Sequence, residues 1–531
     1  MDRDKILVVA TWGLPSSWTR FKYVVEIDHH AFKDLGKLEC ETRCSTFAIW
    51  AYLSKKFDVD LLIFGTDTLV EPGNSGDLRK TAHETYRKHL EQFLGDCDCC
   101  RDLTGRGNVE ISVLPGIGHY YGWRFQASVD NIYNQAFYKI FQKLSNASYK
   151  WIVVDLTHGI NYMMLTVLYA AIANAIVYGL EEKDRVVLLN SEPARVYSPR
   201  VHERASTILE PPGRCGDQHL AILDVRRLQV AIRLIRSLAQ LKKLSFTSLD
   251  KTILKELSGV DESLYDTLEK KVLPFFTLLG NAIVALTFTG SYVSKDGHES
   301  PISTALCREG LKDPGGEFEY HPEVDDKDKV VRYKPASIYA SISLALKKII
   351  GDICKDISSP YLIDYLNKVA DYYKKVGLLY ACLIARSTEH DLETIVKFVK
   401  KTRGLLERCG FVAKPGSGCE NCIEVDGKLL KAMWKKGRKL EDLAEKLMKP
   451  SEEESTYSML EAELGVEEAE SGLKGEEREL RNLCAHAGLN YVSIDRLIID
   501  LDAGNVVKIV YDKDILEKII KSSSIFKQIE L

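Results

Sequence analysis

The sequence WIVVDLTHGINY, residues 151–162, predicts a buried strand that ends in a polar loop and leads into a helix. The strand is apolar up to Asp155, as expected for a parallel strand that is covered on both faces. The loop Thr157-His158-Gly159 follows, and the uncharged stretch 160–180 is long enough to form a helix. Strand, short loop and helix in this order are typical of an α/β domain with a parallel sheet.

The first 200 or so residues repeat this alternation of strands and helices. We expect strands at Lys5–Thr11, Asp60–Gly65, Val109–Leu114, Trp151–Asp155 and Arg185–Asn190, and helices at Ser45–Phe57, Leu78–Leu94, Val129–Leu144 and Ile160–Gly179. Two further runs, Tyr23–Ile27 and Lys37–Glu41, suggest an extra hairpin. The pattern predicts a doubly wound, Rossmann-like α/β domain.

The loop after the strand at 151–155 is a candidate ligand site. In an open α/β sheet, ligands bind at the carboxyl ends of the strands, and a helix N-terminus there offers free N–H groups to a phosphate. Thr157, His158 and Asn161 add donors, and Asp155 is expected to fix the loop by accepting N–H bonds. Gly159 would let the backbone approach a ligand or adopt a positive φ. A helix cap at Thr157 and an ordinary loop histidine are the alternative.

A similar loop follows the first strand, where Gly13, Ser16 and Ser17 are further candidates for ligand binding. Loops at Gly65–Thr68 and Pro115–His119 also follow strands, so four loops are expected at one edge of the sheet. The pattern G-x-G-x-x-G is missing after the first strand, which disfavours an enzyme that transfers hydride to a dinucleotide.

The segment ELRNLCAHAG, residues 479–488, carries the sharpest chemical pattern in the chain. RNA cleavage without a metal requires two proton transfers and a cation for the phosphorane; His486 suits the first task and Arg481 the second. Asn482 and His486 share one helix face, whereas Arg481 and His486, five positions apart, do not. We therefore expect a composite site at a two-fold interface. A surface arginine and a helix-terminal histidine are the alternative.

The composition is that of a globular protein of two or three domains, with 531 residues, 45% of them apolar, and a net charge of −4. Because proteins that coat nucleic acid are usually basic, contacts with RNA are expected to be local. No signal peptide is expected, and the uncharged stretches 160–180 and 272–293 are expected to be buried in protein rather than in a membrane. A cytoplasmic protein is the simplest interpretation.

The 13 cysteines form no complete zinc-binding pattern. Cys97, Cys99 and Cys100 lie together, and Cys419-x-x-Cys422 is a single pair. Because structural zinc needs four ligands, inert thiols or a local disulfide are the expected states, and no metal is expected.

A breaker at 210–213 separates the α/β pattern from helical patterns at Ala221–Leu244, Glu262–Thr289, Ile338–Ile357 and Pro360–Ala385. Segment Ser294–Lys334 is expected to be a loop or insertion, and the acidic segment Lys449–Lys474 a solvated excursion or a frayed helix. A β-hairpin is expected at Arg496–Tyr511 before a last helix. We therefore expect an α/β domain at 1–210, a helical linker at 211–335 and an all-α domain at 336–531.

The two motifs together resemble the CARF–HEPN ribonucleases of type III CRISPR systems, of the Csx and Csm kind. Residues 155–162, DLTHGINY, resemble the ligand loop of the CARF domain, and Arg481-Asn482-x-x-x-His486 resembles the R-x4-His motif of HEPN nucleases. The stretch Leu279–Ala282 also resembles a helix that these proteins carry between the two domains. The R-x4-His motif is short, so the specificity comes from both motifs in the expected order.

The resemblance implies a CARF domain at 1–210 that binds cyclic oligoadenylate, with cyclic tetraadenylate as the expected activator. It implies an HEPN domain at 336–531 that cuts single-stranded RNA without a metal and leaves a 2′,3′-cyclic phosphate, in a homodimer or a larger assembly. It assigns catalysis to Arg481 and His486 with support from Asn482, and ligand binding to Thr157, His158, Gly159 and Asn161, with Gly13, Ser16 and Ser17 beside them. A sensor that only recruits partners and a ring nuclease that degrades its own activator are the alternatives.

Overall fold

The computed structural model describes residues 3–27, 29–72, 77–103, 108–191, 231–232, 235–236, 238–239, 242, 265–266, 268, 272–280, 284–288, 291–292, 318, 320–336, 339–408, 411–415, 421–427, 429–430, 433, 483, 489 and 493–521. These residues divide into two units, one formed by Met1–Arg236 with Asp313–Ala345 and the other by Ser237–Lys312 with Leu346–Leu531.

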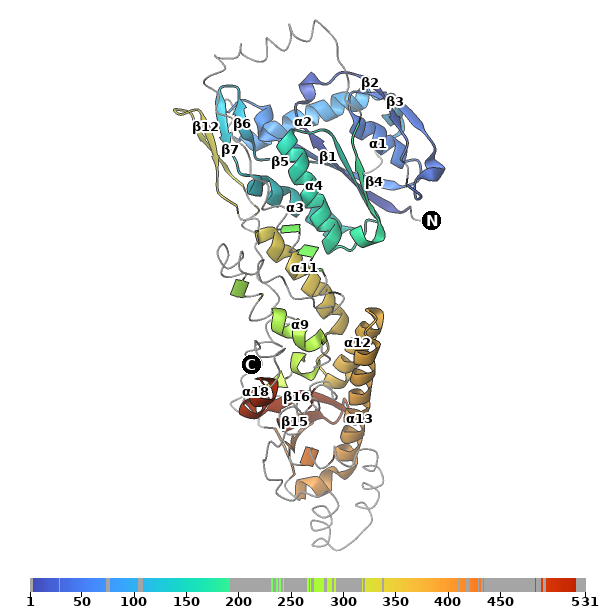
Figure 1. The fold of residues 1–531 in the computed structure, drawn as a ribbon, viewed down its shortest axis with the longest axis vertical. Helices are drawn as coiled ribbons and strands as arrows, with labels where there is room; N and C mark the ends of the chain where they lie inside the picture. The colour runs from blue at the N-terminus through green and yellow to red at the C-terminus, as the bar shows by residue number, and fades with distance from the viewer. Residues whose placement is uncertain are drawn as a thin grey trace. The chain divides into compact units, whose positions relative to one another are not determined.

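The N-terminal unit is built around a five-stranded parallel sheet (Figure 1). Its strands are β1 (Lys5–Trp12), β4 (Asp58–Thr66), β5 (Val109–Leu114), β8 (Trp151–His158) and β9 (Val186–Leu189), in the spatial order β5-β4-β1-β8-β9. All five were predicted from the sequence. The direction of strand addition reverses between β1 and β8, which makes their carboxyl ends the switch point where such sheets bind ligands.

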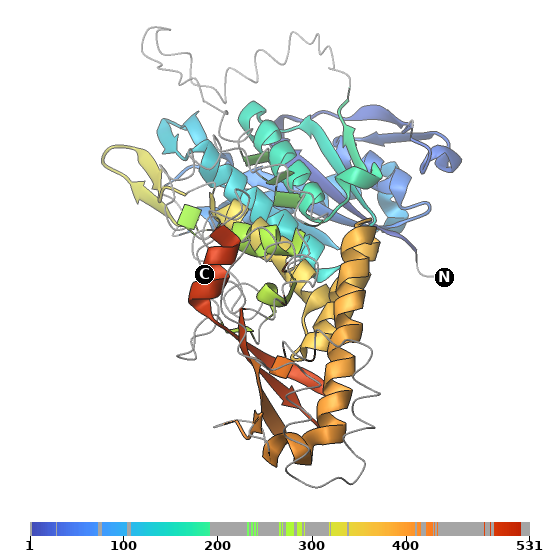
Figure 2. The same cartoon turned by 60° about the horizontal axis from the view of Figure 1, so that its bottom comes forward.

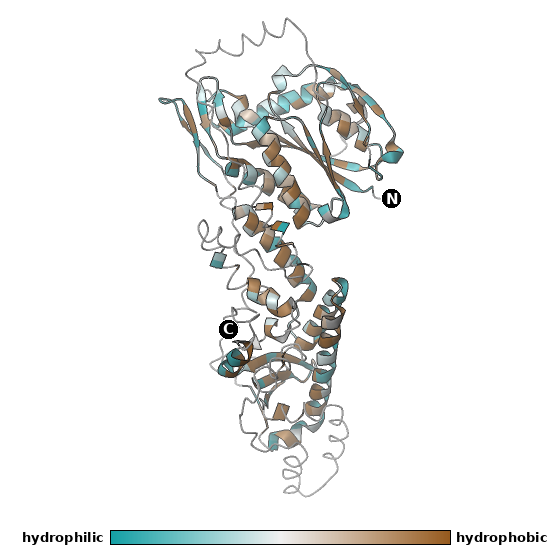
Figure 3. Cartoon of the chain, in the orientation of Figure 1, coloured by the Kyte–Doolittle hydropathy of each residue, from teal (hydrophilic) through white to brown (hydrophobic). Residues whose placement is uncertain are grey.

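Helices cover both faces of this sheet, as the parallel arrangement requires. On one face, α1 (Ser45–Leu53) and α2 (Leu78–Gly95) share a buried core with the even-numbered residues of β1. On the other face, α3 (Val129–Asn146) packs beside α4 (Asn161–Val177), whose length is mostly apolar (Figures 1 and 3). The predicted extra hairpin is also present, as β2 (Phe21–Val25) and β3 (Leu38–Thr42).

Stretch 160–180 therefore forms a helix that packs in protein, as predicted. Among the described helices, none combines the length and the apolar character that crossing a membrane requires.

A second sheet in the N-terminal unit corrects the predicted domain boundaries. It contains β6 (Ile117–Tyr120), β7 (Trp123–Gln126), β11 (Pro322–Asp325) and β12 (Val330–Tyr333), in the order β11-β12-β7-β6. The prediction of a loop at Ser294–Lys334 and of a linker at 211–335 is wrong for the β11–β12 hairpin. This hairpin joins the N-terminal unit because Val331 and Tyr333 share a buried cluster with Trp123 and Phe125.

The second unit contains both helices and a sheet, so the expectation of an all-α domain is wrong. The described helices are α9 (Leu273–Gly280), the end of α11 (Tyr339–Ile357), α12 (Leu362–Lys375), α13 (Leu379–Arg408) and α18 (Lys513–Lys521). The sheet has the order β10-β16-β15-β14-β13, with strands β10 (Ser291–Tyr292), β13 (Val412–Ala413), β14 (Cys422–Asp426), β15 (Ile494–Asp500) and β16 (Asn505–Tyr511). Figure 2 shows β15 and β16 beside α13.

Of the local predictions in the second unit, the hairpin is confirmed and two helix predictions are corrected. The β15–β16 hairpin was predicted, and Gly504 supplies the positive φ of 63° in its turn. The helix predicted at Pro360–Ala385 is two helices, because Gly377 adopts a φ of 85° between α12 and α13. The helix predicted at Glu262–Thr289 ends at Gly280 in its described part and is followed by a separate 3-10 turn at Val284–Thr287.

Candidate functional site

The loops after β1 and β8 lie against each other at the switch point. The backbone N–H of Gly13 donates to the carbonyl oxygen of His158 over 2.7 Å. A Cβ atom at Gly13 would lie 3.0 Å from that oxygen, so a side chain there would push the loops apart. Gly13 therefore sets the distance between the two loops, although it is buried and carries no side chain of its own.

Asp155 joins β8 to the start of α1. Its carboxylate is buried and accepts bonds from the Ser45 and Thr46 hydroxyls at 2.9 and 2.7 Å. Its other oxygen accepts from the Thr157 hydroxyl and backbone N–H at 2.7 and 3.1 Å. The sequence predicted that Asp155 fixes the loop through N–H bonds, and the structure confirms this while adding three hydroxyl donors. A buried carboxylate with four donors needs no further partner.

Thr157 extends this network to the last strand of the sheet. Its hydroxyl donates to Asp155 and accepts the backbone N–H of Ser191 at 3.1 Å, just beyond β9. Thr157 is therefore occupied as a link between two strand ends. It does not cap α4, because the N-cap position is Ile160 and no side chain caps that helix.

His158 lies at the end of β8 with its ring against Trp18, at a centroid distance of 4.2 Å. Its Nε2 atom accepts the backbone N–H of Ser45 at 3.2 Å, so the Tyr23 hydroxyl, also 3.2 Å away, donates to the same nitrogen. Burial lowers the pKa of His158, and the Asp155 carboxylate opposes this only in part. The imidazole is therefore neutral at neutral pH and cannot act as a cationic phosphate ligand.

Gly159 is required by close packing. A Cβ atom there would lie 2.3 Å from Met164 Cγ and 2.4 Å from the Thr11 hydroxyl oxygen. Of the two possibilities the sequence offered for Gly159, a positive φ is not the one adopted. The close approach predicted for Gly159 does occur, but to Thr11 and Met164 of the protein itself.

Asn161, Ser16 and Ser17 are the exposed members of the predicted ligand set. Asn161 is the first residue of α4, whose first turn contains no acidic residue. Ser16 and Ser17 form a short 3-10 turn after β1, and the Ser17 hydroxyl donates to the Leu14 carbonyl oxygen at 2.8 Å. The free N–H groups at the start of α4 and the positive end of its dipole favour an anion at this place.

The structure also shows contacts that the sequence did not identify. Ser45, Thr46 and Tyr23 hold Asp155 and His158 from positions more than 100 residues away in the chain. Paired hydroxyl residues at the start of a predicted helix were the only local signal for Ser45 and Thr46. The predicted catalytic residues Arg481, Asn482 and His486 lie outside the described residues, so their roles stay predictions.

Comparisons with known proteins concern mainly this N-terminal region. Residues 7–193 match the family model described as the CARF domain of the CRISPR system endoribonuclease Csx1. The CRISPR system endoribonuclease Csx1 of Methanocaldococcus jannaschii is 26% identical over 194 residues, which cover 35% of this chain and 37% of that protein. The chain thus aligns with little more than a third of this relative's length.

A solved structure, Enterococcus italicus Csm6 bound to cyclic hexa-2'-fluoro-hexa-dAMP, aligns with 88% of this chain and 96% of that chain at 12% identity. Its TM-score of 0.21 is too low to establish a shared overall fold.

Proposed function

We propose, on the premise that residues 7–193 match the CARF-domain model of Csx1, that the chain is an endoribonuclease of type III CRISPR defence that cyclic oligoadenylate activates. The activator we propose is cyclic tetraadenylate, and the substrate is single-stranded RNA. The protein acts in the cytoplasm as a homodimer or a larger assembly of this chain. The C-terminal part is an HEPN domain in this proposal.

The arrangement at the switch point supports the binding half of the proposal. The oxygens of Asp155 and Thr157 and the Nε2 atom of His158 are engaged by Ser45, Ser191 and one another, so these residues hold the loop in shape. Asn161 and the start of α4 stay exposed beside it. We assign the contacts with the activator's phosphates to Asn161 and the first N–H groups of α4, with Gly13, Ser16, Ser17 and Gly159 shaping the neighbouring surface.

The catalytic half rests on Arg481 and His486. In this mechanism the neutral His486 imidazole accepts the proton of the RNA 2′-hydroxyl, whose oxygen attacks the adjacent phosphorus, and the bond from phosphorus to the 5′-oxygen breaks. His486 moves a proton to the leaving 5′-oxygen, and Arg481 stabilises the charge on the phosphorane. Asn482, the residue after Arg481, supports the pair. The product is a 2′,3′-cyclic phosphate, and the cleavage step uses no metal ion.

The test is cleavage of a labelled single-stranded RNA by the full chain, with and without cyclic tetraadenylate and in the presence of a chelator. We expect cleavage that depends on the activator and is lost in His486→Ala, because the leaving oxygen no longer gains a proton. His390→Ala is the matched control, since His390 is an exposed histidine on α13. It should cut RNA like the parent.

Each alternative has its own outcome in the same assay. Tight binding of cyclic tetraadenylate without any cleavage of RNA by the parent would reject the nuclease and favour a sensor that recruits partners. If chromatography shows that the activator is degraded during incubation, the protein is a ring nuclease.

A further inference from the structure

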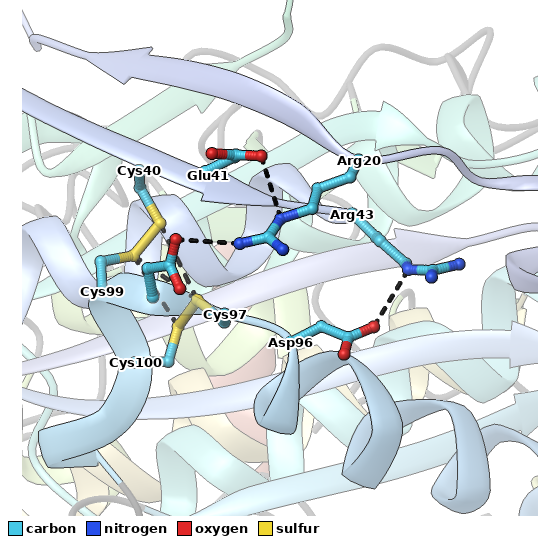
Figure 4. A network of polar contacts seen from close by, with 9 residues as sticks. Arg20, Cys40, Glu41, Arg43, Asp96, Cys97, Cys99 and Cys100 are labelled. Atoms are coloured by element: carbon cyan, nitrogen blue, oxygen red, sulfur yellow. Dashed lines mark hydrogen bonds and ion pairs between the residues drawn. A yellow bond between two sulfur atoms is a disulfide. The ribbon is translucent and has the colours of Figure 1, made fainter.

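Four cysteine sulfurs from two separate segments meet in the N-terminal unit (Figure 4). Cys40 lies on β3, and Cys97, Cys99 and Cys100 lie in and before the 3-10 turn Asp98–Leu103 that follows α2. The structure joins Cys40 to Cys99 and Cys97 to Cys100 as disulfides. The second of these confirms the local disulfide considered from the sequence.

The two disulfides are also in contact with each other. The sulfur of Cys97 lies 3.8 Å from that of Cys40 and 3.5 Å from that of Cys99, and the sulfurs of Cys99 and Cys100 are 3.9 Å apart. Nothing requires the sulfurs of two independent disulfides to lie in contact. Four thiolates on one zinc ion must lie in contact, because zinc–sulfur bonds of about 2.3 Å in a tetrahedron place the sulfurs about 3.8 Å apart.

The spacing and the burial of these cysteines fit a structural metal site. The sulfurs of Cys40, Cys97 and Cys99 all lie within 4.8 Å of one another. Cys100 has the C-x-x-C spacing of a zinc ligand pair with Cys97, adjoins Cys97 and Cys99, and supplies the fourth ligand. Cys40, Cys97 and Cys100 are at most 2% exposed and lie in the main hydrophobic core of the unit. Four soft sulfur ligands with no carboxylate among them favour zinc over magnesium or calcium.

Contacts that do not depend on the disulfides also join the two segments. Arg20 bridges Glu41 on β3 and Asp98 in the turn, at 3.2 and 2.9 Å, and Arg43 pairs with Asp96 at 3.1 Å (Figure 4). The turn also packs on α1 and β3. Four thiols would therefore stay close to one another in the reduced protein, which lowers the entropy lost on metal binding.

We propose that Cys40, Cys97, Cys99 and Cys100 bind one zinc ion as four thiolates in the reduced protein. A dithiol reductant first supplies two electrons and two protons to each disulfide, which gives four thiols. Zinc binding then forms four zinc–sulfur bonds and releases four protons, so the affinity falls as the pH is lowered.

The zinc ion would connect the β2–β3 hairpin to the segment that follows α2. Cys40 is paired directly with Tyr23 across this hairpin, and Tyr23 donates to His158 in the loop after β8. The metal would thus hold in place the strand that supports the candidate ligand loop. The site has a structural role in this proposal, and it stands or falls independently of the proposed nuclease activity.

The experiment measures zinc in the full chain, purified anaerobically with a reductant, by inductively coupled plasma mass spectrometry. We expect about one zinc per chain from the four-ligand site, and an X-ray absorption spectrum with sulfur neighbours at about 2.3 Å. Cys97→Ser should lose most of this zinc. Cys382→Ser is the control, because Cys382 is a free cysteine on α13, and it should keep the metal.

Two results would overturn the proposal. One is a chain without zinc in which the four cysteines remain as two disulfides after reduction and incubation with zinc chloride. The other is zinc that persists in Cys97→Ser, which would place the metal elsewhere. If Cys97→Ser does not fold, the absorption spectrum of the parent decides, since nitrogen or oxygen neighbours in place of four sulfurs contradict this site.

Discussion

The buried carboxyl of Asp67 provides a quantitative test of how the N-terminal unit retains the β11–β12 hairpin. Asp67 follows β4, is fully buried and accepts the Tyr333 hydroxyl of β12 at 2.7 Å. The same hydroxyl accepts the backbone N–H of Gly116 at 3.3 Å. Burial raises the pKa of Asp67 from 3.8 to about 7, although the bond from Tyr333 opposes this.

Because the pKa of Asp67 is raised in the folded chain, the free energy of unfolding falls as the pH rises. Below pH 4 the carboxyl is protonated in both the folded and the unfolded chain, so the folded state carries no penalty. As the pH rises toward 7, the unfolded chain loses this proton while the folded chain keeps it, and the free energy of unfolding falls. Raising the pKa from 3.8 to about 7 corresponds to on the order of 4 kcal/mol between these limits.

We therefore expect Asp67→Asn to remove this loss. Hydrogen exchange of β12, followed by mass spectrometry at pH 5 and pH 8 on the full chain, measures the opening of the hairpin. The protection of the variant relative to the parent should rise by roughly 100-fold from pH 5 to pH 8, because about two pH units separate pH 5 from the raised pKa. Asp326→Asn, an exposed aspartate in the same hairpin, is the control and should leave the ratio flat. A ratio for Asp67→Asn that does not change with pH would refute the reasoning.

Three further substitutions test the candidate ligand site. Gly159→Ala should lower the stability of the N-terminal unit by about 1–3 kcal/mol, because the added Cβ would lie 2.4 Å from the Thr11 hydroxyl oxygen. Thermal unfolding measures this loss, and an unchanged midpoint temperature would contradict the packing argument. His158→Ala removes the acceptor of two hydrogen bonds and should weaken binding of cyclic tetraadenylate by about 5- to 100-fold in calorimetry, whereas His83→Ala, at an exposed histidine on α2, should bind like the parent. Asn161→Asp places a negative charge at the exposed start of α4 and should weaken the same binding by roughly 10-fold while the helix keeps its stability; unchanged affinity would place the phosphates elsewhere.

The sequence by itself determined the five parallel strands of the N-terminal unit and the helices that cover them. Each parallel strand is an apolar run that ends at a polar or glycine-containing loop, and the strand period, the helix period and the loop chemistry are all properties of neighbouring residues. The loop at 155–161 was identified for the same reason. Its glycine and hydroxyl residues are adjacent in the chain, and their position after a strand places them at the sheet edge.

Only the tertiary structure decided which of those residues stay exposed and which hold the loop. Asp155 and His158 are occupied by Ser45, Thr46 and Tyr23. Short strands such as β12 and β14 have little periodicity of their own, and they form because distant strands offer them backbone bonds and apolar contacts. The four cysteines Cys40, Cys97, Cys99 and Cys100, which form no complete metal-binding pattern in the sequence, come together for the same reason. Contacts between residues far apart in sequence depend on the packing of the whole unit, so local sequence patterns do not predict them.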